Sequence, residues 1–176
     1  MLLIAAAALG VFWMLGAYNR LVALRNGIIA AWAQVDEPLQ RRTAALLPLV
    51  AALRFHLHDE QGTLDTVLAA QADLQSAADA LRARPALASR CANLVGAEAR
   101  LQAGLSRLLA LLEQRSGLAA AEDLAPHVAA LHDASQRLAF ARQLFNDSVG
   151  CYNEAARQFP TRLLSSLFGF GVAGKL

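Results

Sequence analysis

Residues 124–159 read LAPHVAALHDASQRLAFARQLFNDSVGCYNEAARQF, and this stretch decides the fold. Its apolar side chains recur in alternating steps of four and three residues, the spacing of a helix face that packs against other helices. The resulting seam consists of Leu124, Val128, Leu131, Ser135, Leu138, Arg142, Phe145, Val149, Tyr152, Ala156 and Phe159. The repeat continues for about five heptads. It therefore predicts one long helix of a bundle, which Phe159-Pro160 ends.

The chain upstream of this seam carries similar helical spacing. Apolar residues from Val22 to Leu57 predict a first helix that runs to about His56, with bends at Pro38 and Pro48. Further boundaries are expected at a loop from His58 to Gly62, at a Thr63 cap, near Arg82, at Arg84-Pro85, at Ser116-Gly117 and at Ala119 or Pro126. The hydrophobic content of 56% is rich in Ala and Leu, the strongest helix formers. We therefore expect an all-α chain with a bundle of about four long antiparallel helices.

The N-terminal segment Leu2–Ala17, LLIAAAALGVFWMLGA, carries no charged side chain. As a helix it would span about 24 Å, slightly less than the hydrocarbon core of a bilayer. Trp13 and Tyr18 lie near its C-terminal end, where aromatic side chains anchor at a membrane interface. We expect residues 1–18 to form a transmembrane anchor that continues directly into a helical bundle over residues 19–160.

Two other interpretations of this segment remain open. A secretory signal peptide would need a basic N-terminal region, which is missing, although Leu15-Gly16-Ala17 offers small residues for cleavage. A core helix would have to be apolar on every face, which is unusual in a small domain. Basic residues follow the segment at Arg20, Arg25, Arg41 and Arg42. For an anchor, the positive-inside rule then places the N-terminus outside and the C-terminal domain in the cytoplasm.

Charge and composition argue against several function classes. The formal net charge of +2 is too balanced for a nucleic-acid-binding protein, and no basic stripe with interleaved aromatic residues occurs. The histidines are His56, His58, His127 and His132. Their spacings do not bring ligands together on one helix face, so we expect no metal and no cofactor. Neither a phosphate-binding loop nor a nucleophile elbow is present, so we expect no enzyme.

The two cysteines, Cys91 and Cys151, do not form a disulfide framework. We expect both to be small buried residues, kept reduced in the cytoplasm. One disulfide between them remains the alternative.

Two blocks of residues resemble a known family. They consist of Tyr18-Asn19, Leu21-Val22, Leu24-Arg25-Asn26, Ala31-Trp32, Val35-Asp36, Leu39 and Arg41-Arg42, and of Arg137, Ala139, Ala141-Arg142, Phe145-Asn146, Val149, Tyr152-Asn153 and Phe159-Pro160. Over nearly the whole chain this resembles the LemA family of bacterial membrane proteins. The resemblance implies an anchor in the bacterial inner membrane, a cytoplasmic bundle of long helices and no established enzymatic activity. The chain departs from the family pattern at Glu37-Pro38, Leu47-Pro48, Ser135 and Phe145, which indicates a divergent member.

Polar residues in these blocks are the candidate interaction sites. Arg142 interrupts an apolar seam, and an unpaired buried charge costs several kcal/mol. We hypothesise that Asp36 pairs with Arg142; the alternative is that Arg142 extends to solvent at the rim. The other candidates are Asn19, Asn26, Asn146, Asn153, Arg41, Arg42 and Trp32. The asparagines form two heptad-spaced pairs, which either set helix register, contact a neighbouring protomer or remain solvated.

The tail, residues 161–176, reads TRLLSSLFGFGVAGKL and is apolar but too short to span a bilayer. Its large apolar residues are Leu163, Leu164, Leu167, Phe168 and Phe170. Three arrangements remain open: a segment in the membrane interface, a contact with a neighbouring subunit, or a frayed terminus.

These features predict a membrane-anchored, non-enzymatic scaffold or interaction protein that self-assembles at the bilayer. A charged content of only 17% predicts exposed apolar surface, which marks interfaces. The expected partners are membrane lipid, further copies of the chain and a membrane protein, not nucleic acid. The alternative is a membrane-tethered helical sensor or adaptor, which would need a pocket with convergent polar groups.

Overall fold

The structure, a computed structural model, describes residues 1–115, 121–158, 161–162 and 170–176; the side chains of residues 2–8 lie outside that description. Its helical elements are α1 (Leu2–His56), the 3₁₀ turn η1 (His58–Glu60), α2 (Gln61–Ala83), α3 (Ala88–Gln114) and α4 (Ala125–Arg157). The prediction of an all-α chain with four long helices is confirmed for this part of the chain.

The helix boundaries follow the breaks in the sequence closely. α1 ends at His56, as predicted, and α2 begins at Gln61, two residues before the expected cap at Thr63. α4 begins at Ala125 with Pro126 in its first turn. Proline is tolerated there because backbone N–H groups of the first turn have no acceptor within the helix. The boundaries expected at Ser116-Gly117, Ala119 and Phe159-Pro160 lie outside the described residues.

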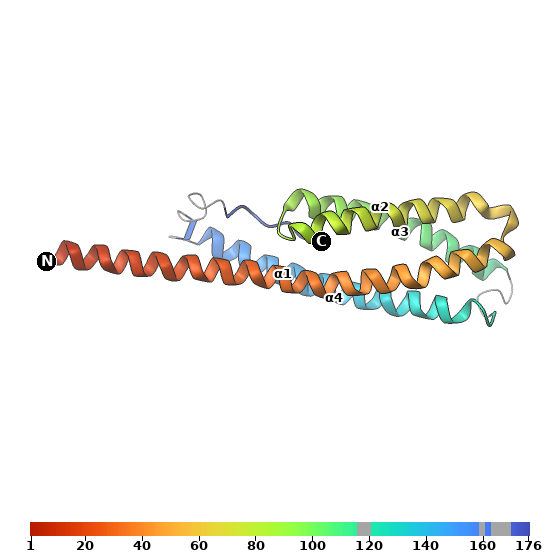
Figure 1. The fold of residues 1–176 in the computed structure, drawn as a ribbon, viewed down its shortest axis with the longest axis horizontal. Helices are drawn as coiled ribbons and strands as arrows, with labels where there is room; N and C mark the ends of the chain where they lie inside the picture. The colour runs from red at the N-terminus through yellow and green to blue at the C-terminus, as the bar shows by residue number, and fades with distance from the viewer. Residues whose placement is uncertain (116–120, 159–160, 163–169) are drawn as a thin grey trace.

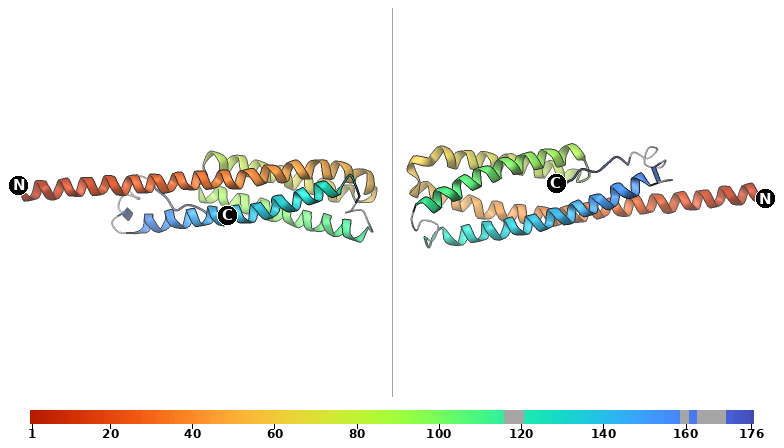
Figure 2. Two further views of the ribbon diagram at one scale, coloured as in Figure 1. Left: turned by 90° about the horizontal axis from the view of Figure 1, so that it is seen from below. Right: turned by 180° about the vertical axis from the view of Figure 1, so that it is seen from behind.

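The four helices form two antiparallel pairs. α1 packs along α4, and α2 packs along α3. Each helix runs opposite to the helix before it (Figure 1). The views from below and from behind show the two pairs lying alongside each other (Figure 2). This arrangement leaves the apolar faces of both pairs turned toward a shared core.

The core is built from the apolar faces of the helices, including the seam predicted for residues 124–159. On α4 the seam residues Leu131, Leu138, Phe145 and Val149 are buried, and the polar residue Arg142 is half-buried. The seam of α3 is buried at Leu94, Leu101, Leu105, Leu108 and Leu112. Each such side chain contributes about 1.5–3 kcal/mol when it is removed from water. The bundle is therefore stabilised mainly by leucine-rich faces rather than by polar contacts.

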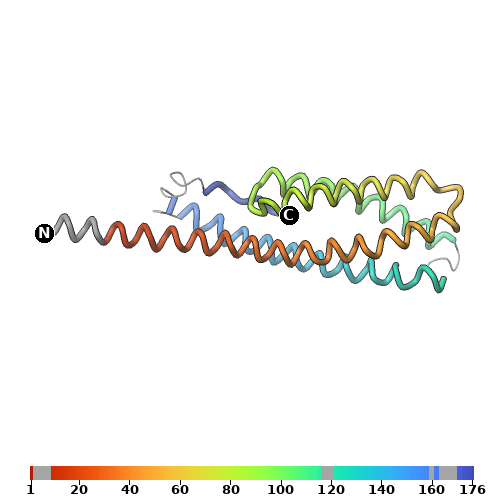
Figure 3. The backbone as a smooth tube through the Cα atoms, in the orientation of Figure 1, coloured from red at the N-terminus to blue at the C-terminus, as the bar shows by residue number. Residues whose placement is uncertain are grey.

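α1 extends beyond the other helices at its N-terminal end (Figure 1). It has 55 residues, which corresponds to about 82 Å, and continues through Pro38 and Pro48 (Figure 3). Its first fully buried side chain in the described part is Leu21. Large apolar side chains before that point are exposed at Leu9, Val11, Phe12, Trp13, Met14 and Leu15. Among the described residues, no other helix covers this part of α1.

Measured by length and apolar content, none of the helices qualifies as a membrane span over the residues described. The expected anchor, residues 1–18, includes residues 2–8, whose side chains lie outside the description.

Candidate functional site

A buried ion pair joins Arg42 on α1 to Glu98 on α3. The guanidinium donates two hydrogen bonds to the carboxylate, from Nη1 to Oε1 at 2.6 Å and from Nη2 to Oε2 at 2.5 Å. The two side chains are 1% and 15% exposed. Bidentate geometry makes such a pair strong and offsets part of the cost of removing both charges from water. Arg42 therefore links the two helix pairs through the core.

Asp36 pairs with Arg82 on α2, and the predicted pairing with Arg142 is wrong. Arg82 donates from Nη2 to Asp36 Oδ1 at 2.7 Å and from Nε to Oδ2 at 3.2 Å. Gln40 Nε2 also donates to Oδ2, at 2.9 Å. The hydrogen bond with Asp36 is the main cause that raises the pKa of Arg82. The pairing with Arg142 fails because Asp36 lies on the side of α1 that faces α2, whereas Arg142 belongs to α4.

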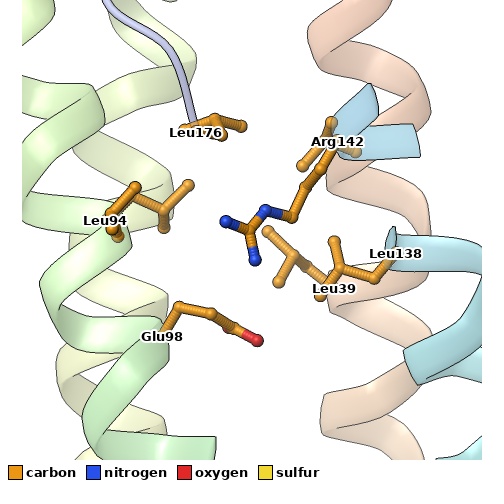
Figure 4. Close-up of a pocket in the computed structure, with 8 residues that line it drawn as sticks. Leu39, Leu94, Glu98, Leu138, Arg142 and Leu176 are labelled. Carbon is orange, nitrogen blue, oxygen red and sulfur yellow. The ribbon is translucent and has the colours of Figure 1, made fainter. Parts of the chain in front are cut away.

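Arg142 lines a small cavity between the two helix pairs. Figure 4 shows its guanidinium extending from α4 toward α3, near Leu94 and Glu98. The cavity has a volume of about 10 Å³, enough for roughly one water molecule. Within the described residues Arg142 makes no hydrogen bond or ion pair. The buried, paired guanidinium of the core is that of Arg42, which pairs with Glu98.

The sequence analysis did not predict the residues that pair with these polar side chains. Besides Glu98, the buried Gln71 on α2 donates from Nε2 to Thr43 Oγ1 at 2.7 Å, which ties α2 to α1. Neither block of family-like residues contains Glu98, Gln71 or Thr43. One signal was present for Glu98: it falls four residues after Leu94, so a carboxylate lies on the apolar face of the third helix.

Asn146 and Asn153 hold the backbone of the C-terminal segment, residues 170–176. Asn153 Nδ2 donates to the carbonyl oxygen of Ala173 at 2.9 Å, and its Oδ1 accepts the Ala173 amide at 2.8 Å. Asn146 makes the same two bonds to Leu176, at 2.7 and 2.8 Å. One heptad separates the two asparagines, so both amides lie on one face of α4. We call these two residues the asparagine clamp.

Three further contacts fix the clamped segment. The Tyr152 hydroxyl donates to the carbonyl oxygen of Gly171 at 3.1 Å. Ala173 forms an antiparallel bridge with Leu87, just before α3. A Cβ atom at Gly174 would lie 2.6 Å from a backbone atom of α3, so only glycine fits there. The segment therefore fastens the start of α3 to α4.

The clamped segment differs from what the sequence suggested for the tail. Residues 170–176 pack on their own bundle, with Ala173 only 4% exposed. Phe170 also contacts Tyr18 edge to face, with ring centroids 5.7 Å apart. Most of the large apolar residues of the tail (Leu163, Leu164, Leu167 and Phe168) lie outside the described residues.

A comparison with protein families matches residues 31–174 to the LemA family. This chain belongs to the LemA family. The match covers most of the chain, from just before Trp32 to Gly174 of the clamped segment, and it confirms the resemblance seen in the sequence. Among curated proteins no significant match is found.

The remaining predicted residues of this LemA protein fall into two groups. Trp32 is buried against Phe145 with ring centroids 6.4 Å apart, and Trp32 Nε1 has no hydrogen-bond partner within the described residues. Arg41 is exposed and pairs with Glu37 one turn earlier on α1. Asn19 and Asn26 are exposed and lie before the matched range. The two heptad-spaced asparagine pairs therefore have different surroundings despite equal spacing.

The thiols of this LemA protein are both free. Cys91 is buried as expected, and burial raises its pKa to about 11. The expected burial of Cys151 is wrong, because it lies on the exposed side of α4. Across the described part of the chain, no group of three or more His, Cys, Asp or Glu side chains is placed to hold a metal ion.

Proposed function

We propose that this LemA protein is a membrane-attached, non-enzymatic scaffold that self-assembles at the bacterial inner membrane. One observation carries the proposal. The part of α1 from Leu9 to Tyr18 lies at the end that extends beyond the other helices (Figure 1). Its large apolar side chains from Leu9 to Leu15 are exposed, and Tyr18, its last residue, contacts Phe170. No charged residue interrupts this part of α1. We call residues 9–18 the projecting segment.

The exposed side chains of the projecting segment supply the driving force for attachment. Leu9 is 74% and Phe12 is 75% exposed. Burying one large apolar side chain contributes about 1.5–3 kcal/mol. Covering the six large aliphatic and aromatic side chains from residue 9 to residue 15 is then favourable by on the order of 5–10 kcal/mol. A hydrocarbon phase is the surrounding that satisfies a helix apolar on every face.

The flanking residues support one orientation in the membrane. Trp13 and Tyr18 have the amphipathic rings that favour the headgroup level, and Arg20 and Arg25 follow directly. We therefore propose a single-pass arrangement with the N-terminus outside and the bundle on the cytoplasmic side.

The bundle itself favours a scaffold over a ligand sensor. The pair Arg42–Glu98 and the asparagine clamp connect the two helix pairs at separate places. The cavity between the pairs holds about one water molecule, too little for a ligand in the core of the bundle. A sensor or adaptor role has one observation in its favour, the unbroken course of α1 from the projecting segment to the far end of the bundle.

Exposed apolar side chains on α4 support self-assembly. Phe140 is 66% and Leu144 is 40% exposed, and they lie at positions i and i+4 of α4, so they share one face. Adjacent exposed apolar residues commonly mark an interaction surface. We propose a second copy of the chain as the partner of this face.

Flotation with phosphatidylcholine vesicles tests the attachment. The full chain is expected to float with the vesicles. The double variant Phe12→Arg/Leu15→Arg is expected to stay in the aqueous fraction, because each arginine in a bilayer-spanning position costs about 2.5–3.5 kcal/mol. Phe55→Arg is the matched control, since Phe55 is 78% exposed at the far end of the bundle. A full chain that does not float contradicts the proposal.

Light scattering in mild detergent, with the detergent mass subtracted, tests the self-assembly. A discrete multiple of the 18.7 kDa chain mass is expected. Phe140→Ser/Leu144→Ser is expected to lower that multiple. A monomer of the unaltered chain would overturn self-assembly and leave membrane attachment standing.

A further inference from the structure

A surface groove lies at the end of the bundle that faces the projecting segment. It has a volume of about 350 Å³ and is formed by α1, the turn between α2 and α3, α4 and the clamped segment. Arg25 on α1 and Arg84 in the turn both line it, together with Tyr152 on α4. Four separate elements thus contribute to one concave surface.

The charge of this groove is not compensated. Arg25 and Arg84 line it, no carboxylate does, and within the described residues neither guanidinium makes a hydrogen bond or ion pair. Other surface grooves combine both signs: Asp73 with Arg90 and Arg100, Glu154 with Arg157 and Lys175, and Glu37 and Asp133 with Arg137. Two unpaired guanidiniums in one concave surface favour an anion there, because paired N–H donors match phosphate oxygens.

Arg25 lies close enough to α4 for its charge to act there. Burial raises the pKa of the Tyr152 hydroxyl, and the positive charge of Arg25 acts in the opposite direction. That hydroxyl already donates its one hydrogen to the carbonyl oxygen of Gly171. Its oxygen can only accept further hydrogen bonds, so the hydroxyl has no donor left for an anion. The two arginines are therefore the positively charged groups that line the groove.

The rest of the groove is apolar and partly exposed. Ile29 on α1, Leu87 before α3 and Val172 in the clamped segment line it with exposures of 49%, 41% and 62%. Free phosphate would leave these side chains in water, whereas a lipid would cover them with its glycerol and acyl carbons. The combination of two cations and an apolar surround therefore fits an amphiphile better than an inorganic ion.

The position of the groove fits the same ligand. Arg25 lies about 10 Å along the helix axis from Tyr18, at which the projecting segment ends. A membrane that takes up the projecting segment would hold its headgroups near this level. The attraction of anionic headgroups for Lys and Arg falls off within a Debye length of the surface, about 8–10 Å.

We infer that this groove binds the phosphate-bearing headgroup of an anionic lipid, with Arg25 and Arg84 as its ligands and Ile29, Leu87 and Val172 against its carbon skeleton. The inference rests on the proposed membrane attachment and adds to it a lipid class and a site. The groove would fix the angle of the bundle relative to the bilayer, because it lies off the axis of α1.

Native mass spectrometry of the full chain in a neutral detergent tests the site, with phosphatidylglycerol and phosphatidylcholine added in equal amounts. The unaltered chain is expected to retain the anionic lipid preferentially. Arg25→Gln/Arg84→Gln is expected to reduce that preference by on the order of tenfold or more. Arg100→Gln/Arg107→Gln removes the same charge from α3 and is expected to keep the preference. Arg25→Lys/Arg84→Lys retains the charge but loses the paired N–H donors, so its preference is expected to lie between that of the unaltered chain and that of Arg25→Gln/Arg84→Gln.

Three results would overturn the inference. The first is an Arg25→Gln/Arg84→Gln variant that behaves like the control pair while keeping its helical circular dichroism. The second is an unaltered chain that retains both lipids equally. The third is displacement of the lipid by millimolar inorganic phosphate, which would make the groove a site for the free anion. Flotation with pure phosphatidylcholine vesicles reports on membrane attachment alone, so a failure of the proposed function is distinguishable from a failure of this site.

Discussion

The two parts of α1 use the same residue types in opposite surroundings. From Leu21 onward, buried apolar residues recur on one face and polar residues cover the others. In the projecting segment, residues 9–18, large apolar side chains point in all directions, and no other helix of the described residues covers them. A one-sided helix finds its partner within the chain, whereas a helix apolar on every face needs an apolar surrounding from outside. The proposed function therefore assigns folding and attachment to separate parts of one helix.

The polar contacts differ between these parts as well. The bundle part of α1 contains Arg42, whose charge is buried and paired with Glu98 across the core. The projecting segment contains no charge at all. Substitutions in the two parts should consequently act on different measurements, unfolding in one case and vesicle binding in the other.

The largest effect is expected from Arg42→Ala. It leaves the carboxylate of Glu98 largely buried without its partner, which costs about 3–5 kcal/mol of unfolding free energy. Urea unfolding followed by circular dichroism measures the change. Vesicle flotation of the folded variant is expected to be unchanged.

Two controls accompany this substitution. Arg42→Met/Glu98→Leu removes both charges and keeps the volume, so it should recover most of the lost stability. Arg41→Ala removes an exposed pair with Glu37 and should change stability by less than about 1 kcal/mol. An Arg42→Ala variant as stable as Arg41→Ala would show that the buried pair contributes little.

The two parts of α1 are compared most directly when the same residue type, leucine, is replaced by alanine in each part. Leu21→Ala removes a fully buried side chain and is expected to cost about 2–5 kcal/mol of unfolding free energy. Leu15→Ala alters a side chain that is 56% exposed and is expected to change stability by less than about 0.5 kcal/mol. Only Leu15→Ala should weaken vesicle binding. Equal destabilisation by both would refute the separation.

A smaller effect is expected at the asparagine clamp. Asn153→Ala removes two hydrogen bonds to Ala173, each worth about 0.5–1.5 kcal/mol. Amide hydrogen exchange of residues 170–176 should become faster, while exchange in the core of α1 should stay slow. Asn19→Ala is the control, because Asn19 is exposed. Unchanged protection of residues 170–176 in Asn153→Ala would contradict the claim that Asn153 holds this segment on α4.

The smallest effect concerns the two thiols. Cys151 is exposed and should react with iodoacetamide at pH 8, whereas buried Cys91 should react only on unfolding. The pKa of Cys91 is raised from 9.0 to about 11. As pH rises through that range the unfolded chain loses the thiol proton before the folded chain does, so stability falls. In Cys91→Ala this part of the alkaline decrease should disappear.

Much of the fold was predictable because helix packing leaves a periodic signature. The seam from Leu124 to Phe159 predicted the course of α4, and the break at Arg84-Pro85 predicted the end of α2. These features depend on local spacing, which the sequence records directly.

The choice of polar partners was not predictable in the same way. A salt bridge depends on how each helix is rotated about its axis, which the spacing of apolar residues does not fix. The prediction therefore paired Asp36 with Arg142, whereas the structure pairs it with Arg82. Arg42 was a candidate, but its partner Glu98 lay in a helix without other distinctive residues. The asparagine pairs make the same point. Asn19 and Asn26 have the spacing of Asn146 and Asn153, yet only the latter pair meets a backbone segment far along the chain.

The chain's two tryptophans allow a direct test of the central claim, that the projecting segment enters a bilayer while the bundle stays outside it. Trp32→Phe leaves Trp13 in the projecting segment, and Trp13→Phe leaves Trp32 in the core. The measurement is quenching of each fluorescence by lipids brominated along their acyl chains, in vesicles that carry the full chain. We predict quenching of Trp13 that is strongest when the bromine lies near the headgroup end of the acyl chain, and little quenching of Trp32 at any depth. Trp13 that is not quenched, and that remains accessible to aqueous iodide in the presence of vesicles, would contradict the account.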